Sequence, residues 1–292
     1  MAPVHLSAIG YACGAPLPLR DLAEPMPVDL TLPEYGLATY RRSDEPGWRL
    51  AVAAAQRSLS AAPHQPDLLV YVTETDQDPA DGVARIADAL GLPTVAHVSV
   101  GGHGCGNLGP ALRLASDALA AGRCDRVLLV LADRADQRPR VMTSGLSVFS
   151  DGSACCLVSR EPVGAGPRFT VDAVVTRSRV RPGTADWDML HLAELAAECA
   201  EGIAEETGRR PAAFDHVLFA NYRIVSQRFF ASALRGPQDR LLVGPVAELG
   251  HCFSADLLIT LDQYADRITP GGHVLASAIG PHSWSAIAIG CP

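Results

Sequence analysis

The chain has 292 residues, of which 48% are hydrophobic and 19% are charged, and its formal net charge is −8. This composition supplies enough apolar surface for one large or two coupled domains and is unlike that of a disordered chain. The acidic balance argues against a protein that grips nucleic acid or an anionic membrane surface, since both need a basic face. No apolar run approaches the roughly 18 residues that span a bilayer.

Short apolar runs alternate with longer amphipathic runs along the chain, which predicts an α/β fold. Continuous apolar runs predict buried strands at residues 68–72, 127–133, 154–159, 217–221, 274–280 and 285–290. Apolar residues spaced three to four apart predict helices at residues 47–62, 111–122, 189–208 and 253–268. Residues 16–33 are rich in proline and predict an irregular surface connection.

A Gly/Pro cluster at residues 161–168 is the best candidate for an internal boundary. We expect it to separate an N-terminal half, residues 1–165, from a C-terminal half, residues 166–292, with a similar order of elements. The eight cysteines show no disulfide framework, and the N-terminus lacks the blocks of a secretory signal, so we expect reduced thiols in a cytoplasmic protein. No CxxC, HExxH or phosphate-loop pattern occurs, so we expect no metal and no bound cofactor.

The most informative segment is residues 97–119, where a strand-like run enters a glycine-rich turn, then Cys105, then a helix. At a helix N-terminus the dipole and the unpaired N–H groups favour a thiolate, and the same N–H groups could bind a developing oxyanion. Cys105 is therefore a candidate nucleophile. The pattern fits equally well a small buried cysteine in a glycine-rich packing corner.

Six phrases along the chain carry a family resemblance: GLATYRR at 36–42, GCGNLGPAL at 104–112, FSDGSACCL at 149–157, LFANYRI at 218–224, LGHCFSAD at 249–256 and SAIGPHSWSA at 277–286. In this order they resemble the motifs of the thiolase-fold β-ketoacyl-acyl-carrier-protein synthase III enzymes over nearly the whole chain. The resemblance implies a five-layered αβαβα fold of two pseudo-equivalent halves, with Cys105 as nucleophile. It also implies a homodimer whose sheets join edge to edge.

Two departures from the family motifs bear on the reaction. Leu218 stands where the condensing members have a histidine, and His251 stands where they have an asparagine. Because leucine cannot donate a hydrogen bond to a thioester carbonyl, decarboxylative condensation is disfavoured. The chain resembles instead a branch with a Gly-His segment and a downstream aspartate, here Asp256. That branch transfers acyl groups in secondary metabolism without decarboxylation.

The resemblance thus implies a nucleophile, a base and an orienting carboxylate at Cys105, His251 and Asp256. An offset of five residues is not an ideal same-face pair, so His251 would have to fold back toward Asp256. In the alternative reading, His251 simply packs and Asp256 is a solvated helix residue. The oxyanion hole implied by the family consists of the backbone N–H groups of Cys105 and Gly280.

Four further residues are candidates for secondary roles. Glu74 resembles the acid/base of hydroxymethylglutaryl-CoA synthases, and Asn221 keeps a family position that could hold a water or a loop. His103 and His282 are near Cys105 and Gly280 in sequence and could touch a substrate. Each also has a plainer explanation as a solvated carboxylate, a polar strand residue or a side chain that fills a turn.

We therefore expect an acyltransferase that loads an acyl group onto Cys105 from a coenzyme A or phosphopantetheinyl acyl carrier protein thioester. The acyl group would then pass to the hydroxyl or amine of a small-molecule acceptor. A carbon–carbon condensing enzyme with Glu74 or His251 as base is one alternative. A non-catalytic partner subunit of a synthase is another.

Overall fold

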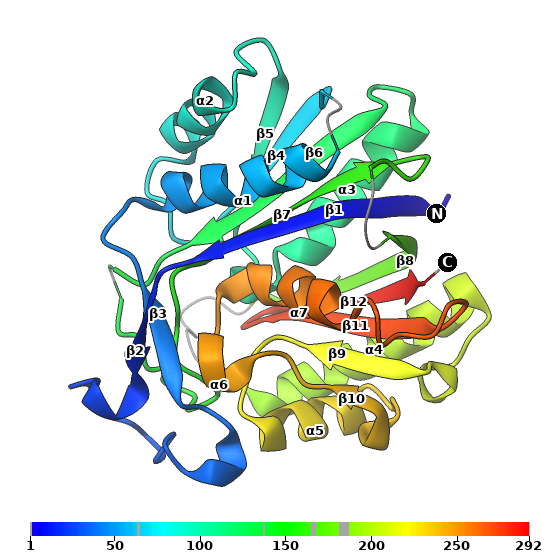
Figure 1. Cartoon of the computed structure of the whole chain (residues 1–292). Coiled ribbons are helices and arrows are strands. Elements are labelled where there is room, and N and C mark those ends of the chain that lie inside the picture. Colours follow the sequence, from blue (N-terminus) through cyan, green and yellow to red (C-terminus); the bar gives the residue numbers. More distant parts are fainter. Residues whose placement is uncertain (1, 63–64, 137, 165–167, 181–186, 292) are drawn as a thin grey trace.

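The structure is a computed structural model that describes residues 2–62, 65–136, 138–164, 168–180 and 187–291 (Figure 1). Ten strands of this described part form one sheet, in the order β10-β9-β11-β12-β8-β1-β7-β6-β4-β5. The first five in sequence are β1 (Val4–Cys13), β4 (Leu68–Val72), β5 (Ala96–Val100), β6 (Arg126–Asp133) and β7 (Gly152–Ser159). The other five are β8 (Arg168–Ser178), β9 (His216–Phe219), β10 (Leu241–Leu242), β11 (His273–Gly280) and β12 (Ser283–Gly290).

The strand order repeats on the two sides of the contact between β1 and β8. One side has the order β5-β4-β6-β7-β1 and the other has β10-β9-β11-β12-β8. On each side the first three strands of the run are parallel, and the remaining neighbours are antiparallel. Two runs of five strands therefore share one topology and meet through the antiparallel pair β1–β8.

Helices pack on these strands in three layers (Figure 1). The outer helices α1 (Gly47–Ala61) and α2 (Pro79–Ala89) cover the N-terminal strands, and α4 (Met189–Thr207) and α5 (Ile224–Ala233) cover the C-terminal strands. Between the two runs of strands lie α3 (Leu108–Ala120) and α7 (Asp256–Tyr264), which share one core with both. The result is the five-layered αβαβα fold that was expected. A short helix, α6 (Val246–Leu249), and a two-stranded sheet of β2 (Ala15–Pro18) and β3 (Thr39–Arg42) complete it.

The central helices pack against both runs of strands because most of their residues are apolar or small, while Arg113 and Asp117 of α3 are exposed. Residues 256–261 of α7 are all buried, and Gly109 of α3 lies so close to β12 that a Cβ there would be 2.1 Å from the Ser285 hydroxyl oxygen. A 3-10 turn precedes each helix: η3 (Gly104–Gly106) before α3 and η6 (Phe253–Ala255) before α7. The turns touch, because the Ser254 hydroxyl donates a 3.2 Å hydrogen bond to the Cys105 carbonyl. The starts of the two central helices therefore meet.

The predicted strands and helices are confirmed with small shifts of their ends. The helix expected at 253–268 is divided into η6 and α7 and ends at Tyr264. The expectation for residues 16–33 is wrong in part, because Leu19 and Leu30 are fully buried against Val141 and Val148. Residues 165 and 166, where the boundary between the halves was expected, lie outside the described residues. In the part of the chain that is described, no helix is long and apolar enough to cross a bilayer.

Candidate functional site

Cys105 lies in the turn η3, between β5 and the central helix α3. The backbone at Gly102 and Gly104 has φ values of +86° and +60°, which glycine adopts without strain, and this brings the chain sharply from the strand into the helix. The Cys105 residue is 6% exposed and faces a cavity of about 500 Å³. The cysteine is thus buried at the wall of a cavity that Gly102, His103 and Gly104, which are more exposed, also line.

The structure brings together the three residues proposed as a set. The His251 Nε2 atom lies 3.0 Å from the Cys105 sulfur, and the His251 Nδ1 atom lies 2.5 Å from the Asp256 Oδ2 atom. The chain turns back between His251 and Asp256, since Gly250 has a φ of +61° and Phe253 a φ of +52°. This local conformation, which the five-residue offset did not reveal, lets a histidine before η6 reach the first residue of α7.

The Asp256 carboxylate is fully buried and accepts hydrogen bonds from several donors. Besides His251, the backbone N–H of Cys252 donates at 2.8 Å, the backbone N–H of Asn221 at 2.8 Å and the Asn221 side-chain amide at 3.2 Å. Together these donors satisfy both oxygens of a carboxyl group that has no exposed surface. Asn221 therefore lies behind Asp256 and holds its carboxylate, and it does not line the cavity.

The charge state of His251 follows from its two neighbours. Burial alone lowers the pKa of the imidazole, but the Cys105 sulfur and the Asp256 carboxylate outweigh burial and raise the pKa to about 10. A histidine with this pKa is protonated at neutral pH, with one ring N–H directed at the Cys105 sulfur and the other at the Asp256 carboxylate.

Three aromatic rings enclose the His251 imidazole. The centroids of Tyr222, Phe149 and Phe253 lie 5.0, 5.6 and 5.8 Å from that of His251. The guanidinium of Arg138 lies over the Phe149 and Phe253 rings at 5.4 and 5.7 Å. The three rings were not predicted from the sequence as neighbours of His251, because no local pattern marks an aromatic residue as the neighbour of a histidine distant in sequence.

Gly280 lies against the turn that carries Cys105. A Cβ on Gly280 would be 1.9 Å from the His103 carbonyl oxygen, and a Cβ on Gly106 would be 3.1 Å from the Gly280 nitrogen. Only glycine fits at 280, since the obstacle is backbone that cannot rotate away. The end of β11 and the cysteine turn are therefore in direct contact, as a shared oxyanion site requires.

Glu74, His103 and His282 line the cavity beside Cys105. The Glu74 Oε2 atom accepts hydrogen bonds from the Gly102 N–H at 3.0 Å, the Gly104 N–H at 3.1 Å and the Asn107 amide at 3.1 Å. Glu74 therefore braces the cysteine turn through one oxygen. No sequence motif predicted this contact. It forms because β4 and β5 are parallel neighbours, so that Glu74 after β4 lies beside the turn after β5.

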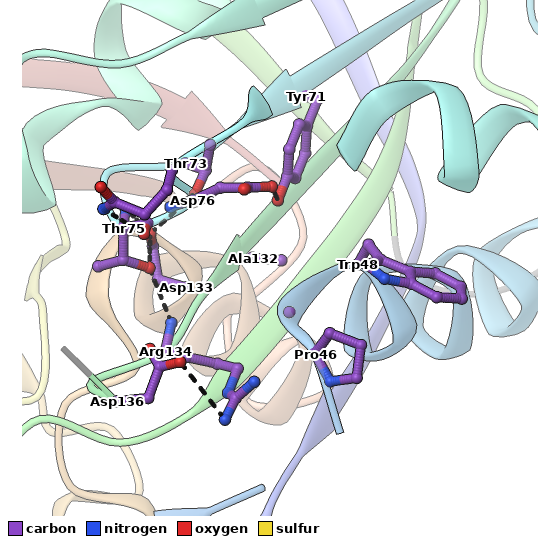
Figure 2. Close-up of a pocket in the computed structure, with 12 residues that line it drawn as sticks. Pro46, Trp48, Tyr71, Thr73, Thr75, Asp76, Ala132, Asp133, Arg134 and Asp136 are labelled. Carbon is purple, nitrogen blue, oxygen red and sulfur yellow. Dashed lines mark hydrogen bonds and ion pairs between the residues drawn. The ribbon is translucent and has the colours of Figure 1, made fainter. Parts of the chain in front are cut away.

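A second buried carboxylate fixes the segment that carries Glu74. Asp133, at the end of β6, accepts hydrogen bonds from the Thr75 N–H and from the hydroxyls of Thr73 and Thr75, at 2.9 to 3.1 Å (Figure 2). It also accepts the backbone N–H of Glu74 at 2.7 Å. Burial raises the pKa of Asp133 to about 6 in spite of these donors. A small cavity of about 190 Å³ lies next to it, with Trp48 on its wall. Asp133 thus supports the cysteine turn indirectly.

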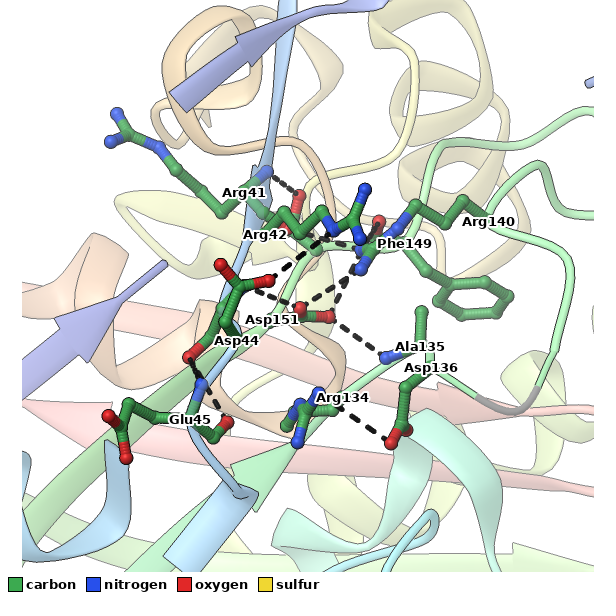
Figure 3. A network of polar contacts seen from close by, with 12 residues as sticks. Arg41, Arg42, Asp44, Glu45, Arg134, Ala135, Asp136, Arg140, Phe149 and Asp151 are labelled. Atoms are coloured by element: carbon green, nitrogen blue, oxygen red, sulfur yellow. Dashed lines mark hydrogen bonds and ion pairs between the residues drawn. The ribbon is translucent and has the colours of Figure 1, made fainter. Parts of the chain in front are cut away.

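A buried ion pair holds the strand segment that meets His251. The two terminal nitrogens of the Arg140 guanidinium donate to Asp151, at 3.0 and 2.9 Å (Figure 3). Asp151 also accepts the backbone N–H of Ala135 at 2.9 Å. Arg140 further donates to the carbonyl of Phe149 at 3.2 Å. The next residue along, Ser150, donates its N–H to the His251 carbonyl at 2.8 Å. The pair therefore fixes the loop on which the His251 backbone rests.

Among the residues that the structure describes, no group of three or more His, Cys, Asp or Glu side chains gathers in a way that could hold a metal ion.

Comparisons with known proteins point to one fold and to relatives of one kind. No family model matches the chain. The chain is 28% identical over 277 residues to β-ketoacyl-acyl-carrier-protein synthase III 4 of Streptomyces coelicolor, covering 85% of this chain and 84% of the relative. Among solved structures it superposes on the acyltransferase ChlB3 with a TM-score of 0.83, at 20% identity, covering 99% and 97% of the two chains. It superposes on 3-oxoacyl-acyl-carrier-protein synthase III of Pseudomonas aeruginosa PAO1 with a TM-score of 0.82, at 18% identity, covering 100% and 99%.

The five layers and the cysteine at the start of a central helix define a protein with the thiolase-like fold. Within that fold, the chain is similar in sequence to curated ketoacyl synthase III proteins, which supports the resemblance to that family read from the motifs. The acyl-transferring branch with Cys105, His251 and Asp256 stays a prediction.

Proposed function

We propose that the protein is an acyltransferase that carries an acyl group on Cys105 and passes it to a hydroxyl or amine without decarboxylation. The observation that supports this most directly is the continuous contact from the Cys105 sulfur through His251 to Asp256, with separations of 3.0 and 2.5 Å. Nucleophile, base and orienting carboxylate in this order form the arrangement used for covalent acyl transfer on several unrelated folds.

The proposed reaction has two halves. The Cys105 thiolate attacks the carbonyl carbon of a thioester, the N–H groups of Cys105 and Gly280 stabilise the oxyanion, and the thiol leaves with a proton from His251. The neutral imidazole then removes the proton of the acceptor hydroxyl or amine, which attacks the acyl-cysteine and releases the Cys105 thiolate. Asp256 keeps the Nδ1 proton in place in both halves, so that Nε2 always faces the reacting atoms.

The absence of a suitable donor at residue 218 argues against a malonyl substrate. Leu218 is fully buried in the core between the two runs of strands, away from the cavity lining. An apolar side chain there offers nothing to an enolate oxygen. Glu74, the base of the alternative condensing mechanism, already accepts hydrogen bonds through one oxygen from three donors, which favours a bracing role.

We also propose that the donor is a thioester of coenzyme A or of a phosphopantetheinyl acyl carrier protein and that the protein is a homodimer. The relatives are named as acyl-carrier-protein synthases. The strand β5 pairs with β4 and ends the order of strands in the sheet, and its residues 96, 97 and 99 are exposed. An open edge of this kind can accept the same strand of a second copy.

The test is intact-protein mass spectrometry after incubation with acetyl-, longer acyl- and malonyl-thioesters. We expect a single acyl adduct on Cys105, no adduct on Cys105→Ala, and loss of the adduct when a hydroxyl or amine acceptor is added. Release of carbon dioxide from the malonyl donor would support a condensing enzyme instead. A wild-type protein that takes no acyl group from any thioester would overturn the proposal and favour a non-catalytic subunit.

A further inference from the structure

Tyr222 lies between the base His251 and the end of β11, which carries Gly280. It follows β9 in the loop that leads to α5, and it is fully buried. Its ring centroid is 5.0 Å from that of His251, and Trp187 and Phe230 pack edge-on against it, each at 5.7 Å. The Gln227 amide holds the Tyr222 carbonyl at 2.5 Å. The ring therefore has one position.

The hydroxyl of Tyr222 reaches the peptide unit that ends at Gly280. It donates a hydrogen bond to the Ile279 carbonyl at 3.3 Å. That carbonyl and the Gly280 N–H belong to one planar trans peptide, in which C=O and N–H point in opposite directions. A hydrogen bond to the oxygen therefore fixes the direction of the N–H and also polarises it, since linked hydrogen bonds strengthen one another.

The position of Tyr222 in the chain connects this contact to the base. The preceding residue, Asn221, holds the Asp256 carboxylate with its N–H and its side chain. Two consecutive residues thus contact the carboxylate that orients His251, the His251 ring, and the peptide that carries the Gly280 N–H. Burial, together with the charges of Cys105 and Asp256, raises the pKa of Tyr222 far above its usual value, so its hydroxyl keeps the proton that it donates.

We infer that Tyr222 is a positioning residue that sets the oxyanion-binding N–H of Gly280 and supports the His251 ring, so that both halves of the acyl transfer depend on its hydroxyl. The inference rests on the proposed function, because it assigns Tyr222 to the same acyl-cysteine site. It predicts that the hydroxyl affects the rate of reaction and the state of the bound acyl carbonyl but not the affinity for the donor.

The experiment compares wild type, Tyr222→Phe and Tyr264→Phe. Tyr264 is the matched control, because its hydroxyl also donates to a backbone carbonyl, that of Val243 at 2.9 Å, outside the cavity lining. Acylation of Cys105 is followed by rapid-quench mass spectrometry with an acyl-thioester and by p-nitrophenolate release with p-nitrophenyl acetate. The acyl-enzyme made with a ¹³C-labelled carbonyl is examined by difference infrared spectroscopy.

We expect Tyr222→Phe to lower the acylation rate about ten-fold with an apparent KM within two-fold of wild type, the size expected for one indirect hydrogen bond. The acyl carbonyl band of Tyr222→Phe should move to higher frequency, because its oxyanion-site hydrogen bond is weaker, while Tyr264→Phe matches wild type. Equal rates and equal bands in all three proteins would overturn the inference. Acylation by p-nitrophenyl acetate without acylation by any thioester would overturn the proposed function alone, since the ester still tests Tyr222.

Discussion

The imidazole of His251 lies between the Cys105 sulfur and the Asp256 carboxylate, with three aromatic rings around it. The sulfur and the carboxylate determine its protonation. Because its pKa is raised from the usual 6.5 to about 10, folding binds a proton that the unfolded chain would lose. The stability that comes from this proton is fully present below pH 6.5 and is lost as the pH rises toward about 10. Buried thiols such as Cys155, whose pKa burial raises to about 12, also lower stability at high pH, so a comparison between variants is needed.

We expect the free energy of unfolding to fall more steeply between pH 6.5 and 10 in wild type than in His251→Gln, which has no ionising ring. Urea unfolding at a series of pH values measures the difference, and buried thiols that do not touch His251, such as Cys155, cancel in the comparison. Parallel curves for the two proteins would show that His251 is not protonated by its neighbours. A steeper curve for the variant would reverse the sign and contradict the assignment outright.

Asp256→Asn tests the orienting role of the carboxylate, because it replaces one carboxylate oxygen by an amide nitrogen. Asp256→Asn keeps the shape but presents an amide to the His251 Nδ1 atom, which favours the wrong tautomer. We expect acyl transfer to fall by a factor on the order of 10³, while folding is retained because Asn still offers one acceptor oxygen. Asp262→Asn, on the same helix and half-buried, is the control and should retain the wild-type rate. A rate for Asp256→Asn within three-fold of wild type would exclude it from the reaction.

At the scale of single elements, the central helix α3 is constrained by its neighbour β12. Alanine at position 109 would raise the helix propensity, but its Cβ would lie 2.1 Å from the Ser285 hydroxyl oxygen and 2.3 Å from the Ser285 Cβ. We expect Gly109→Ala to lower the free energy of unfolding by about 1–3 kcal/mol through overpacking. Because Cys105 lies at the start of this helix, activity should fall as well.

A double-mutant cycle identifies the cause. Ser285→Gly removes both atoms that obstruct residue 109, so the double variant should lose less stability than the sum of the two single variants. Denaturant unfolding of the four proteins measures the coupling. If the losses of stability in the two single variants add up to the loss in the double variant, the contact between residues 109 and 285 is not the cause.

The strands and the outer helices could be predicted from the sequence because each has a strong local period, as at 68–72 and 189–208. The convergence of Cys105, His251 and Asp256 came from motif resemblance, not from spacing, and the turn at Phe253 that makes it possible has no sequence signal. Tyr222, Arg140 and Asp133 were missed for a common reason. A buried polar or aromatic side chain acquires its role from partners on other elements, and local patterns carry no information about them.

At the scale of the whole molecule, the open edge at β5 is where a second copy would join. We expect a dimeric mass by light scattering for wild type and a monomeric mass for His97→Asp/Ser99→Asp, which places like charges across the joined edges. Both positions are exposed in the single chain, so the substitutions should leave its fold intact. A monomeric wild type would contradict the homodimer. A dimer that persists in the double variant would show that the interface does not lie at β5.

Cys105 lies in the turn before α3 and His251 precedes the turn before α7, so the two halves of the chain contribute one residue each to the reactive pair. The pair therefore exists only where both halves are folded against each other. Because a small displacement is enough to break the 3.0 Å contact between the Cys105 sulfur and the His251 Nε2 atom, we expect activity to be lost during heating no later than the secondary structure.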